Sequence, residues 1–493
     1  MFSPDSGTLI EHLFHKASEH PDKLALQAAG HDLSYSDFCS RILTAAARLR
    51  ATGVRPGYRV LFSAPNNLTV PILYFAIHAV GAVAVPTGPD TPDGVLAALA
   101  AGCEPRLALL DRPVEGLPCP VESACEAAAP GNCSASATLS PCCRPGDIAD
   151  LLYTTGTTGA KKGVVLTQAA ILAAARNMSE FIGTAPDDVE LVPLPLSHSF
   201  GLGRLRCLAL LGHSMLIEPG VGTGVPLIKR LRDARPTGLA LVPAGFEILR
   251  QMTRDALGMS RERLRYVEIG SAPMRAETRR WLMEMLPETR ICHHYGLTEA
   301  SRAAFTEYHG DRHKPGTAGK AAPHVDISIC TESLEPAAPG QAGEVVIQGD
   351  MLLREYWKRP DLTNRNLCPL GLRTGDLGYL DHDGYLFLLG RQNDVINVGG
   401  RKVIPDEVEE AIRRFAGVHD AACVAEADPL SGQRVKAFVA ADGPVDMRSL
   451  TLFLRTLVEE YKIPKALVTV ESIPRTSSGK LQRNLLREAI HGA

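Results

Sequence analysis

Residues 153–163 read Tyr153-Thr-Thr-Gly-Thr-Thr-Gly-Ala-Lys-Lys-Gly163 and place four threonines, three glycines and two lysines within eleven positions. Glycines allow sharp backbone turns that bring N–H groups close to an anion, and hydroxyl and ammonium groups add further donors. This composition predicts a phosphate-binding loop. It is not a Walker A loop, because Lys161 stands where that motif requires the Gly of its Gly-Lys-Ser/Thr sequence. Taken alone, the stretch also fits an ordinary Gly/Thr turn.

Three later segments carry polar groups that suit a nucleotide. Tyr295-Gly-Leu-Thr-Glu-Ala300 offers an aromatic face, a hydroxyl and a carboxylate, which suit a base, a phosphate and Mg²⁺. Arg373-Thr-Gly-Asp-Leu-Gly378 adds the carboxylate of Asp376, which suits two ribose hydroxyls. Pro474-Arg-Thr-Ser-Ser-Gly-Lys-Leu-Gln-Arg483 presents Lys480 on a glycine-containing loop. Each segment alone also fits a plainer interpretation. The first could be a loop with an N-cap-like Thr298, the second a turn that contains Asp376, and the third a solvated basic tail.

The composition indicates a globular protein of more than one domain. Its 493 residues exceed one hydrophobic core of ordinary size, and 45% of them are apolar while 22% are charged. The net charge of -3 provides no basic surface for a nucleic acid or an anionic membrane. Small molecules are therefore the expected partners.

Two segments bear on the compartment. Met1 to Ile10 lacks the basic and apolar regions of a signal peptide, so a cytoplasmic location is expected. The apolar run Val70 to Pro86 contains His78 and is shorter than a membrane span requires. We expect it to form a buried helix followed by a buried strand, and we expect no membrane span.

The twelve cysteines do not indicate a metal site. Five of them fall irregularly in residues 114–146, a stretch rich in Pro, Ala and Ser, without a paired CxxC: Cys119, Cys125, Cys133, Cys142 and Cys143. We expect reduced thiols. The same stretch is the weakest candidate for regular structure and is expected to be a surface excursion.

Short apolar runs alternate with helical patterns along the chain. Ala240 to Val242 and Tyr266 to Ile269 are typical of buried strands, and Arg275 to Met285 is typical of a helix. This alternation predicts an α/β fold with largely parallel sheets.

A domain boundary is expected near Gly390-Arg391, where the apolar strand Tyr385 to Leu389 gives way to polar residues. Beyond it, Pro405 suits the first position of a helix, and Val408, Ala411 and Ile412 would form its apolar face. The predicted domains are therefore residues 1–390 and a small α+β domain of residues 391–493.

The four polar segments, taken together and in this order, resemble those of the adenylate-forming superfamily, which includes acyl-CoA ligases, peptide-synthetase adenylation domains and luciferases. The resemblance extends from about residue 8 to about residue 486. It implies a large N-terminal domain that binds ATP and the acyl group, and a small mobile C-terminal domain that carries the catalytic lysine. It also implies ATP and Mg²⁺ as cofactors, and a thiol of coenzyme A or of phosphopantetheine as acceptor.

The resemblance implies a role for each matching residue. The residues that match ATP-binding positions are Thr154, Thr155, Gly156, Thr157, Thr158, Lys162, Gly270, Ser271, Ala272, Pro273, His294, Tyr295, Gly296, Asp376 and Arg391. Those that match catalytic positions are Thr298 at the α-phosphate, Glu299 at Mg²⁺ and Lys480 between the substrate carboxylate and the α-phosphate.

The resemblance disfavours an α-amino acid as the substrate, because Pro193 to Gly201 lacks the aspartate that amino-acid-activating members usually carry. In fatty-acyl and aryl ligases the positions of His198 and Phe200 border the acyl tunnel, although a structural role for His198 fits equally well. The C-terminal sequence resembles stand-alone acyl-CoA ligases, and a separate carrier protein stays open as the acceptor.

Two positions depart from the pattern of the superfamily. Asn393 occupies the pivot of domain rotation, where members usually have Asp or Lys, and Asn397 stands where many carry lysine. Asparagine tolerates unusual backbone angles, so rotation is still expected. A non-catalytic relative would be expected to lack Lys480, Glu299 or Asp376, and all three are present. An oxidation by O₂ like that of the luciferases stays open, because it has no motif by which it could be recognised in the sequence.

Overall fold

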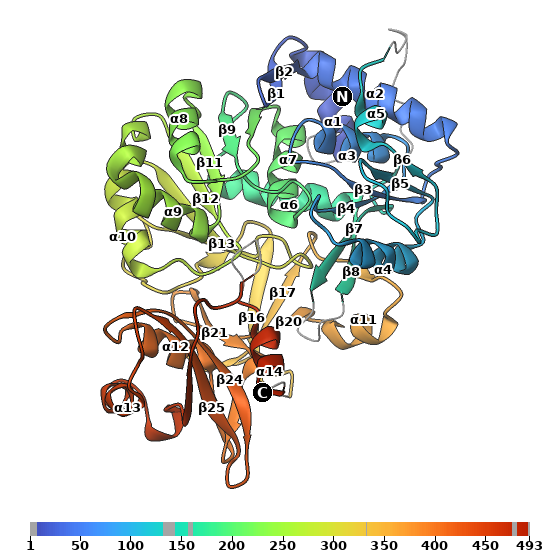
Figure 1. Cartoon of the computed structure of the whole chain (residues 1–493). Helices are drawn as coiled ribbons and strands as arrows, with labels where there is room; N and C mark the ends of the chain where they lie inside the picture. The colour runs from blue at the N-terminus through green and yellow to red at the C-terminus, as the bar shows by residue number, and fades with distance from the viewer. Residues whose placement is uncertain (1–6, 132–142, 156–160, 332, 476–480, 492–493) are drawn as a thin grey trace.

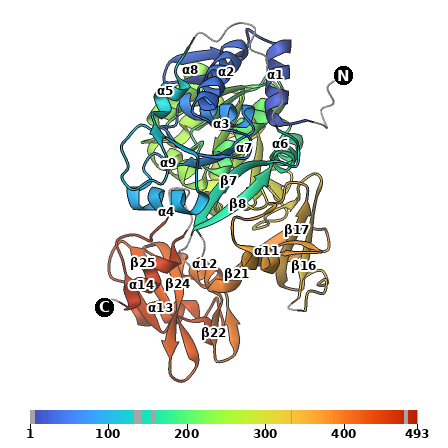
Figure 2. The same cartoon turned by 90° about the vertical axis from the view of Figure 1, so that its right-hand side faces the viewer.

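The computed structural model describes residues 7–131, 143–155, 161–331, 333–475 and 481–491. Their strands form four sheets. Figures 1 and 2 both place the C-terminal elements at the lower end of the molecule, beneath the larger part formed by the rest of the chain. Every helix within the described residues is too short or too polar to cross a membrane.

The largest sheet has nine strands, parallel in its centre and antiparallel at its edges. Its central strands are buried along their whole length, as in Tyr266–Ile269, which suits a parallel sheet covered on both faces. In spatial order the strands are β15 (Lys320–Ala321), β14 (Ala304–Glu307), β13 (Arg290–Tyr295), β12 (Tyr266–Ile269), β11 (Gly238–Leu241), β9 (Val189–Val192), β10 (Ser214–Ile217), β1 (Leu24–Ala28) and β2 (His31–Ser34).

A second sheet has seven strands, which are parallel except at one edge, where β7, β8 and β18 pair antiparallel. In spatial order they are β18 (Glu355–Tyr356), β8 (Lys161–Thr167), β7 (Ile148–Thr155), β4 (Val83–Thr87), β3 (Arg59–Ser63), β5 (Leu107–Leu110) and β6 (Val121–Glu122). The third sheet is antiparallel and consists of β16 (Val325–Cys330), β17 (Gly343–Gly349), β20 (Gly371–Leu380), β19 (Leu367–Cys368) and β21 (Leu386–Arg391).

Helices cover the two large sheets. They are α1 (Leu9–Glu19), α2 (Tyr35–Ala51), α3 (Thr69–Ala79), α4 (Asp93–Cys103), α5 (Ala124–Ala128), α6 (Gln168–Ile182), α7 (Ser199–Leu211), α8 (Val225–Ala234), α9 (Pro243–Thr253), η1 (Arg254–Ser260), α10 (Ala276–Met285) and α11 (Pro360–Asn366). Several begin at the caps that their sequences predict: the Ser34 hydroxyl accepts from the N–H of Asp37, and the Thr167 hydroxyl accepts from the N–H of Ala170. Helix α6 ends at Gly183 in the left-handed conformation, which glycine adopts without strain.

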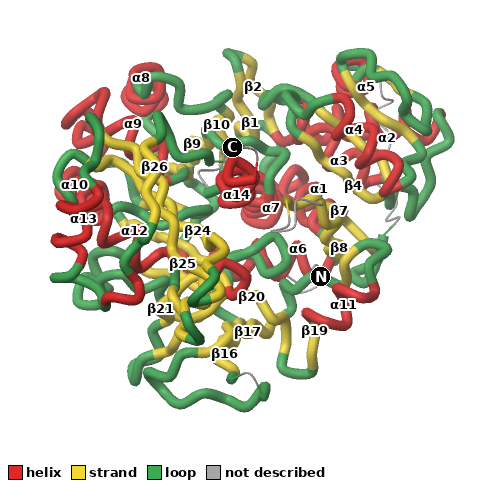
Figure 3. Tube along the Cα trace, turned by 60° about the horizontal axis from the view of Figure 1, so that its bottom comes forward, coloured by secondary structure: helices red, strands yellow, loops and turns green. Residues whose placement is uncertain are grey.

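The C-terminal residues form a separate small sheet with its own core. Its elements are η2 (Gln392–Asp394), β22 (Ile396–Val398), β23 (Arg401–Val403), α12 (Pro405–Arg413), β24 (Val418–Asp428), β25 (Gly432–Ala441), α13 (Met447–Leu454), η3 (Glu460–Lys462), β26 (Ala466–Thr469) and α14 (Arg483–His491). Along β24, Ala421 and Cys423 face α12 and α13, while Ala422 and Val424 face Leu486 of α14. Figure 3 shows the strands with these helices on opposite sides.

The α/β class with largely parallel sheets is confirmed. The apolar run Val70 to Pro86 forms α3 and most of β4, as expected, and Pro405 occupies the first turn of α12. Small differences arise at element ends: Val242 lies beyond β11, Arg275 caps α10, and β21 extends to Arg391.

The expectation for residues 114–146 was partly wrong. This stretch contains β6 and α5, and α5 buries Ala124, Ala127 and Ala128 against the core. Ser123 caps the helix, and alanine favours helix strongly, so a segment that its Pro and Ser content marks as irregular still folds. Cys133 and Cys142 lie outside the described residues, and the ten described cysteines are free thiols.

Candidate active site

Two loops meet where β12 and β13 end. These strands are parallel neighbours with Ile269 opposite His293, so the residues that follow them lie at the same edge of the sheet. Gly270 to Pro273 follows β12, and the segment from Gly296 to Ala300 follows β13. Polar groups that follow neighbouring parallel strands share one crevice, the usual place for a ligand in such sheets.

The first loop is held by two histidines. The ring of His294 packs so closely on Gly270 that a Cβ there would lie 1.9 Å from it, which explains the glycine. His293 Nε2 lies 3.0 Å from the carbonyl oxygen of Ala272, and the Tyr308 hydroxyl lies 2.8 Å from His293 Nδ1. Because a carbonyl only accepts, Nε2 donates to it, and Nδ1 accepts from Tyr308. Ser271 has a φ of +80°, an uncommon conformation for serine.

His293 is neutral at ordinary pH. Burial lowers its pKa to about 4, and the neighbouring His294 acts in the same direction. The sequence alone does not indicate a role for this residue, since a lone histidine in a strand gives no signal of its function. Its position two residues before Tyr295 was the only available hint.

Tyr295, Asp376 and Arg391 meet beside this loop. Asp376 on β20 pairs in register with Arg391 on β21, and Arg391 Nε lies 2.6 Å from Asp376 Oδ1. The Tyr295 hydroxyl donates to the other oxygen, Oδ2, over 2.5 Å. Burial, and then the Asp376 carboxylate, raise the pKa of Tyr295, so its hydroxyl stays protonated as a donor. Three segments that are distant in sequence thus meet at one buried carboxylate.

Glu299 lies beside the strand that carries Lys162. The Tyr356 hydroxyl donates to Glu299 Oε1 over 3.1 Å, and Lys162 Nζ lies 5.9 Å from the centre of the Tyr356 ring. Burial, followed by the Glu299 charge, raises the pKa of Tyr356 and keeps it a donor. A carboxylate and an ammonium group therefore flank one aromatic ring, an arrangement that suits Mg²⁺ and phosphate oxygens.

Thr298 lies beside the start of α7. Its Oγ1 is 3.5 Å from Ser199 Oγ, at the limit of a hydrogen bond. His198 precedes the helix in an extended conformation and is exposed, whereas Phe200 is buried with its ring edge-on to His294 at 4.8 Å. The two residues expected at the acyl tunnel thus lie next to the residue expected at the α-phosphate.

Part of the expected site lies outside the described residues. These are Gly156, Thr157 and Thr158 of the expected phosphate loop and Lys480, the lysine expected to be catalytic. The strands that flank the loop are described: Thr154 pairs with Lys162, and Thr155 with Lys161. Within the described residues, no group of three or more His, Cys, Asp or Glu could hold a metal. A single carboxylate such as Glu299 is still suitable for Mg²⁺, which binds largely through phosphates and water.

A group of buried charges that was not predicted from the sequence lies behind the site. Glu268 on β12 lies within 3.0 Å of Arg302 Nε, and Arg302 has a left-handed φ of +54°. A Cβ at Gly296 would lie 2.5 Å from the backbone nitrogen of Arg302, so Gly296 permits the close approach of this turn. The signal available in the sequence was a charge inside apolar runs, as in Leu202-Gly-Arg-Leu-Arg206.

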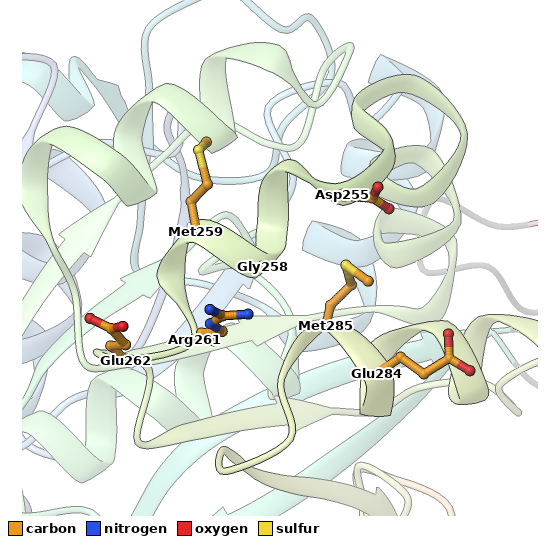
Figure 4. Close-up of a pocket in the computed structure, with 7 residues that line it drawn as sticks. All are labelled: Asp255, Gly258, Met259, Arg261, Glu262, Glu284 and Met285. Carbon is orange, nitrogen blue, oxygen red and sulfur yellow. The ribbon is translucent and has the colours of Figure 1, made fainter.

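A hollow of about 470 Å³ lies elsewhere, between η1 and the end of α10. Figure 4 shows Met259 and Met285 among the residues around it, together with Arg261 and acidic side chains. None of the residues expected at the site lines this hollow. We assign it no role.

Comparisons with known proteins agree with this geometry. The chain matches the model of AMP-binding enzymes over residues 13–357 and that of the AMP-binding enzyme C-terminal domain over residues 407–480. It is 30% identical to a feruloyl-CoA synthase from Amycolatopsis sp., with 96% of this chain and 97% of that protein covered. It is 28% identical to a long-chain-fatty-acid–CoA ligase from Bacillus subtilis, with 98% and 94% covered.

The fold also resembles solved structures. The crystal structure of ATP-bound MatB from Rhodopseudomonas palustris matches with a TM-score of 0.90 at 28% identity, and the match covers 98% of this chain and 99% of that one. The likeness therefore extends over both the larger part and the C-terminal part of the chain.

Proposed function

The chain belongs to the family of AMP-binding enzymes, and on that premise we propose how its residues divide the work of acid activation. It is an AMP-forming ligase that activates a fatty or aryl acid with ATP and passes the acyl group to coenzyme A. In the first step a carboxylate oxygen attacks the α-phosphorus, and the bond to pyrophosphate breaks. In the second step the thiol sulfur attacks the acyl carbon, AMP leaves, and the thiol proton is released.

The contact of Tyr295 and Arg391 with Asp376 is the observation that carries the assignment of the nucleotide site. We assign adenine to the crevice between Tyr295 and the loop Gly270 to Pro273, and the ribose hydroxyls to Asp376 and Arg391. The phenol and the guanidinium hold both carboxylate oxygens of Asp376. A carboxylate fixed in this way loses little freedom when a ribose binds.

The phosphates are assigned to the hairpin of β7 and β8, which presents Thr154 and Lys162, and to the loop Thr155 to Thr158. Thr298 is assigned to the α-phosphate because it lies next to the start of α7. Glu299 is assigned to Mg²⁺, which when bound neutralises phosphate charge. His294 and Gly296 support the site by packing, His294 against Gly270 and Gly296 against Arg302.

We assign Lys480 to a position between the substrate carboxylate and the α-phosphate of ATP. A substrate carboxylate must reach an already negative triphosphate, and a positioned ammonium stabilises the charge that gathers between them. Groups of this kind typically contribute roughly 3 to 4 kcal/mol each to the transition state. Lys480→Ala should therefore slow formation of the acyl-adenylate by roughly 10² to 10³-fold.

We propose a domain boundary at residues 390 and 391. In support, the hydrophobic clusters of the C-terminal sheet contain no described residue before Ile396. Asn393 lies in η2, which joins β21 to β22, and rotation about this segment is proposed between the two steps. We also propose the cytoplasm as the compartment, because the reaction draws on intracellular ATP and coenzyme A.

The decisive experiment measures ATP-dependent pyrophosphate release with a panel of acids, with and without coenzyme A. Release with a suitable acid, and a thioester once coenzyme A is added, are expected. If pyrophosphate is released but coenzyme A yields no thioester, the acceptor is the phosphopantetheine of a carrier protein. If no acid supports release, the proposal is wrong.

A further inference from the structure

Three arginines are among the largest fully buried side chains of the described residues. They are Arg204 and Arg206 on α7, and Arg302 beyond the Tyr295 to Ala300 segment. A buried charge is very costly unless it is paired, so each of these arginines needs an acidic partner. Arg206 pairs with Asp150 on β7, towards the seven-stranded sheet. Arg204 and Arg302 both pair with Glu268 of the nine-stranded sheet. Figure 1 shows α7 between the two large sheets.

We define the buried charge cluster as Glu190, Arg204, Glu268, His294 and Arg302, and His213 borders it with Nε2 3.4 Å from Glu190 Oε2. Glu268 is its centre: Oε1 lies 3.0 Å from Arg302 Nε and 2.9 Å from His294 Nδ1, and Oε2 lies 3.2 Å from Arg204 Nη1. Arg204 Nε reaches on to Glu190 Oε1 at 2.7 Å. These side chains therefore form one continuous chain of contacts from β13 to β9.

Both guanidinium groups of the cluster are paired with carboxylates. Burial lowers the pKa of His294, and the adjacent guanidinium groups add to this effect, although Glu268 opposes it. Burial alone would raise the pKa of Glu268, but the charges of Arg302 and Arg204 outweigh it and hold that pKa below its ordinary value. Two carboxylates thus balance two guanidinium groups. Both guanidinium groups are thus already engaged and are not available to a second carboxylate on a substrate.

The cluster lies directly behind Phe200. Arg302 donates to the carbonyl oxygens of Ser199 and Phe200 over 3.1 and 3.0 Å, and its Cζ lies 5.0 Å from the centre of the Phe200 ring. A Cβ on Gly203 would lie 2.4 Å from Arg302 Nη1. The space between α7 and the strands is therefore too tight even for one methyl group at this point.

We propose that the buried charge cluster closes the acyl pocket immediately behind Phe200, so that this ligase activates short-chain fatty acids. The inference rests on the proposed function, which places the acyl group beside His198 and Phe200. A long alkyl or aryl tail would have to separate paired charges that water does not reach. Breaking a buried pair is strongly unfavourable, and contacts with an apolar tail do not replace it.

The acid specificity of the unaltered protein tests this proposal. The kcat/KM for pyrophosphate release is measured with acetate, propionate, butyrate, octanoate, dodecanoate and ferulate. We expect the highest value among the first three and a value at least about 100-fold lower for octanoate and ferulate. A kcat/KM for octanoate or ferulate that equals that of butyrate overturns the inference and leaves the proposed function intact. If no acid supports release, the proposed function itself fails, and the inference with it.

A paired substitution tests the cluster directly. Glu268→Gln combined with Arg302→Ala removes one charge of each sign and makes space behind Phe200. We expect the ratio of kcat/KM for octanoate to that for butyrate to rise at least about tenfold. The matched control is Asp150→Asn with Arg206→Ala, an equally buried pair on the other side of α7.

The control should change this ratio by less than about twofold, because it faces the other sheet. An unchanged ratio in the first variant, or equal changes in both, argues against the cluster as the end of the pocket. If the first variant does not fold, the acid series of the unaltered protein decides alone.

Discussion

Tyr295 donates its hydroxyl to Asp376 over 2.5 Å, although 81 residues separate the two in the chain. Tyr295 ends β13 in the nine-stranded sheet, and Asp376 lies on β20 in the antiparallel sheet. Their contact fixes the end of β13 to the strand that carries the carboxylate proposed to bind the ribose. The phenol therefore has two proposed tasks: its ring faces adenine, and its hydroxyl orients Asp376.

The two tasks can be separated by substitution. Tyr295→Phe keeps the ring and removes a hydrogen bond to a buried carboxylate, which typically contributes about 1 kcal/mol or somewhat more. We expect the KM for ATP to rise about three- to tenfold in pyrophosphate exchange, with little change in kcat. Tyr295→Ala should raise the KM further because stacking is lost as well.

Tyr379→Phe is the control for this experiment. Tyr379 lies on the same strand as Asp376, and its ring stacks on Phe387. Removal of this hydroxyl should leave the KM for ATP unchanged. A Tyr295→Phe variant that is indistinguishable from Tyr379→Phe would show that the contact with Asp376 has no part in nucleotide binding.

If Glu299 binds Mg²⁺, its substitution should change how pyrophosphate release depends on the Mg²⁺ concentration. Glu299→Gln keeps the shape of the side chain but removes the charge that attracts the ion. The Mg²⁺ concentration for half-maximal pyrophosphate release should rise at least about tenfold at fixed ATP. Tyr356→Phe removes only the hydrogen bond to Glu299 and should shift the same titration in the same direction, but less. An unshifted Mg²⁺ titration in Glu299→Gln would rule out its proposed role.

The alternating apolar and helical patterns predicted the α/β fold, and this is confirmed. The sequence also assigned the Tyr295 to Ala300 segment and the loop with Lys162 to the site, and these assignments stay predictions. The hydrogen bond from Tyr295 to Asp376 depends on how two sheets pack against each other. The residues near either position in the sequence do not indicate this packing. Arg204 and Arg302 were missed for the same reason, because their partners Glu190 and Glu268 lie on separate strands.

His293 predicts a change of stability with pH. Its pKa is about 4 in the folded protein and 6.5 ordinarily, so the unfolded chain binds more protons between these values. Stability must therefore fall as the pH drops through this window. Between pH 7 and pH 5 the loss from this group amounts to roughly 2 kcal/mol.

His293→Gln should lack this loss, because its amide can still donate to Ala272 but does not titrate. The measurement compares the free energy of unfolding in urea at pH 7 and pH 5 for both proteins. The exposed His382→Gln serves as the control and should follow the unaltered protein. If His293→Gln loses as much stability as the unaltered protein on acidification, His293 is not held neutral by burial.

Two helical glycines allow a test of how tightly the buried charge cluster is packed. Gly→Ala in a helix ordinarily stabilises by up to about 1 kcal/mol, because alanine has the higher helix propensity. At Gly203 the added Cβ would lie 2.4 Å from Arg302 Nη1, and the guanidinium cannot move without losing Glu268 and two carbonyl oxygens. Gly203→Ala should therefore destabilise by about 1 to 3 kcal/mol. Gly94 in α4 has no neighbouring atom within 4 Å of such a Cβ, so Gly94→Ala should be neutral or stabilising. The measurement compares the thermal unfolding of both variants. If Gly203→Ala is as stable as Gly94→Ala, Arg302 has room to move. The space behind Phe200 would then be open.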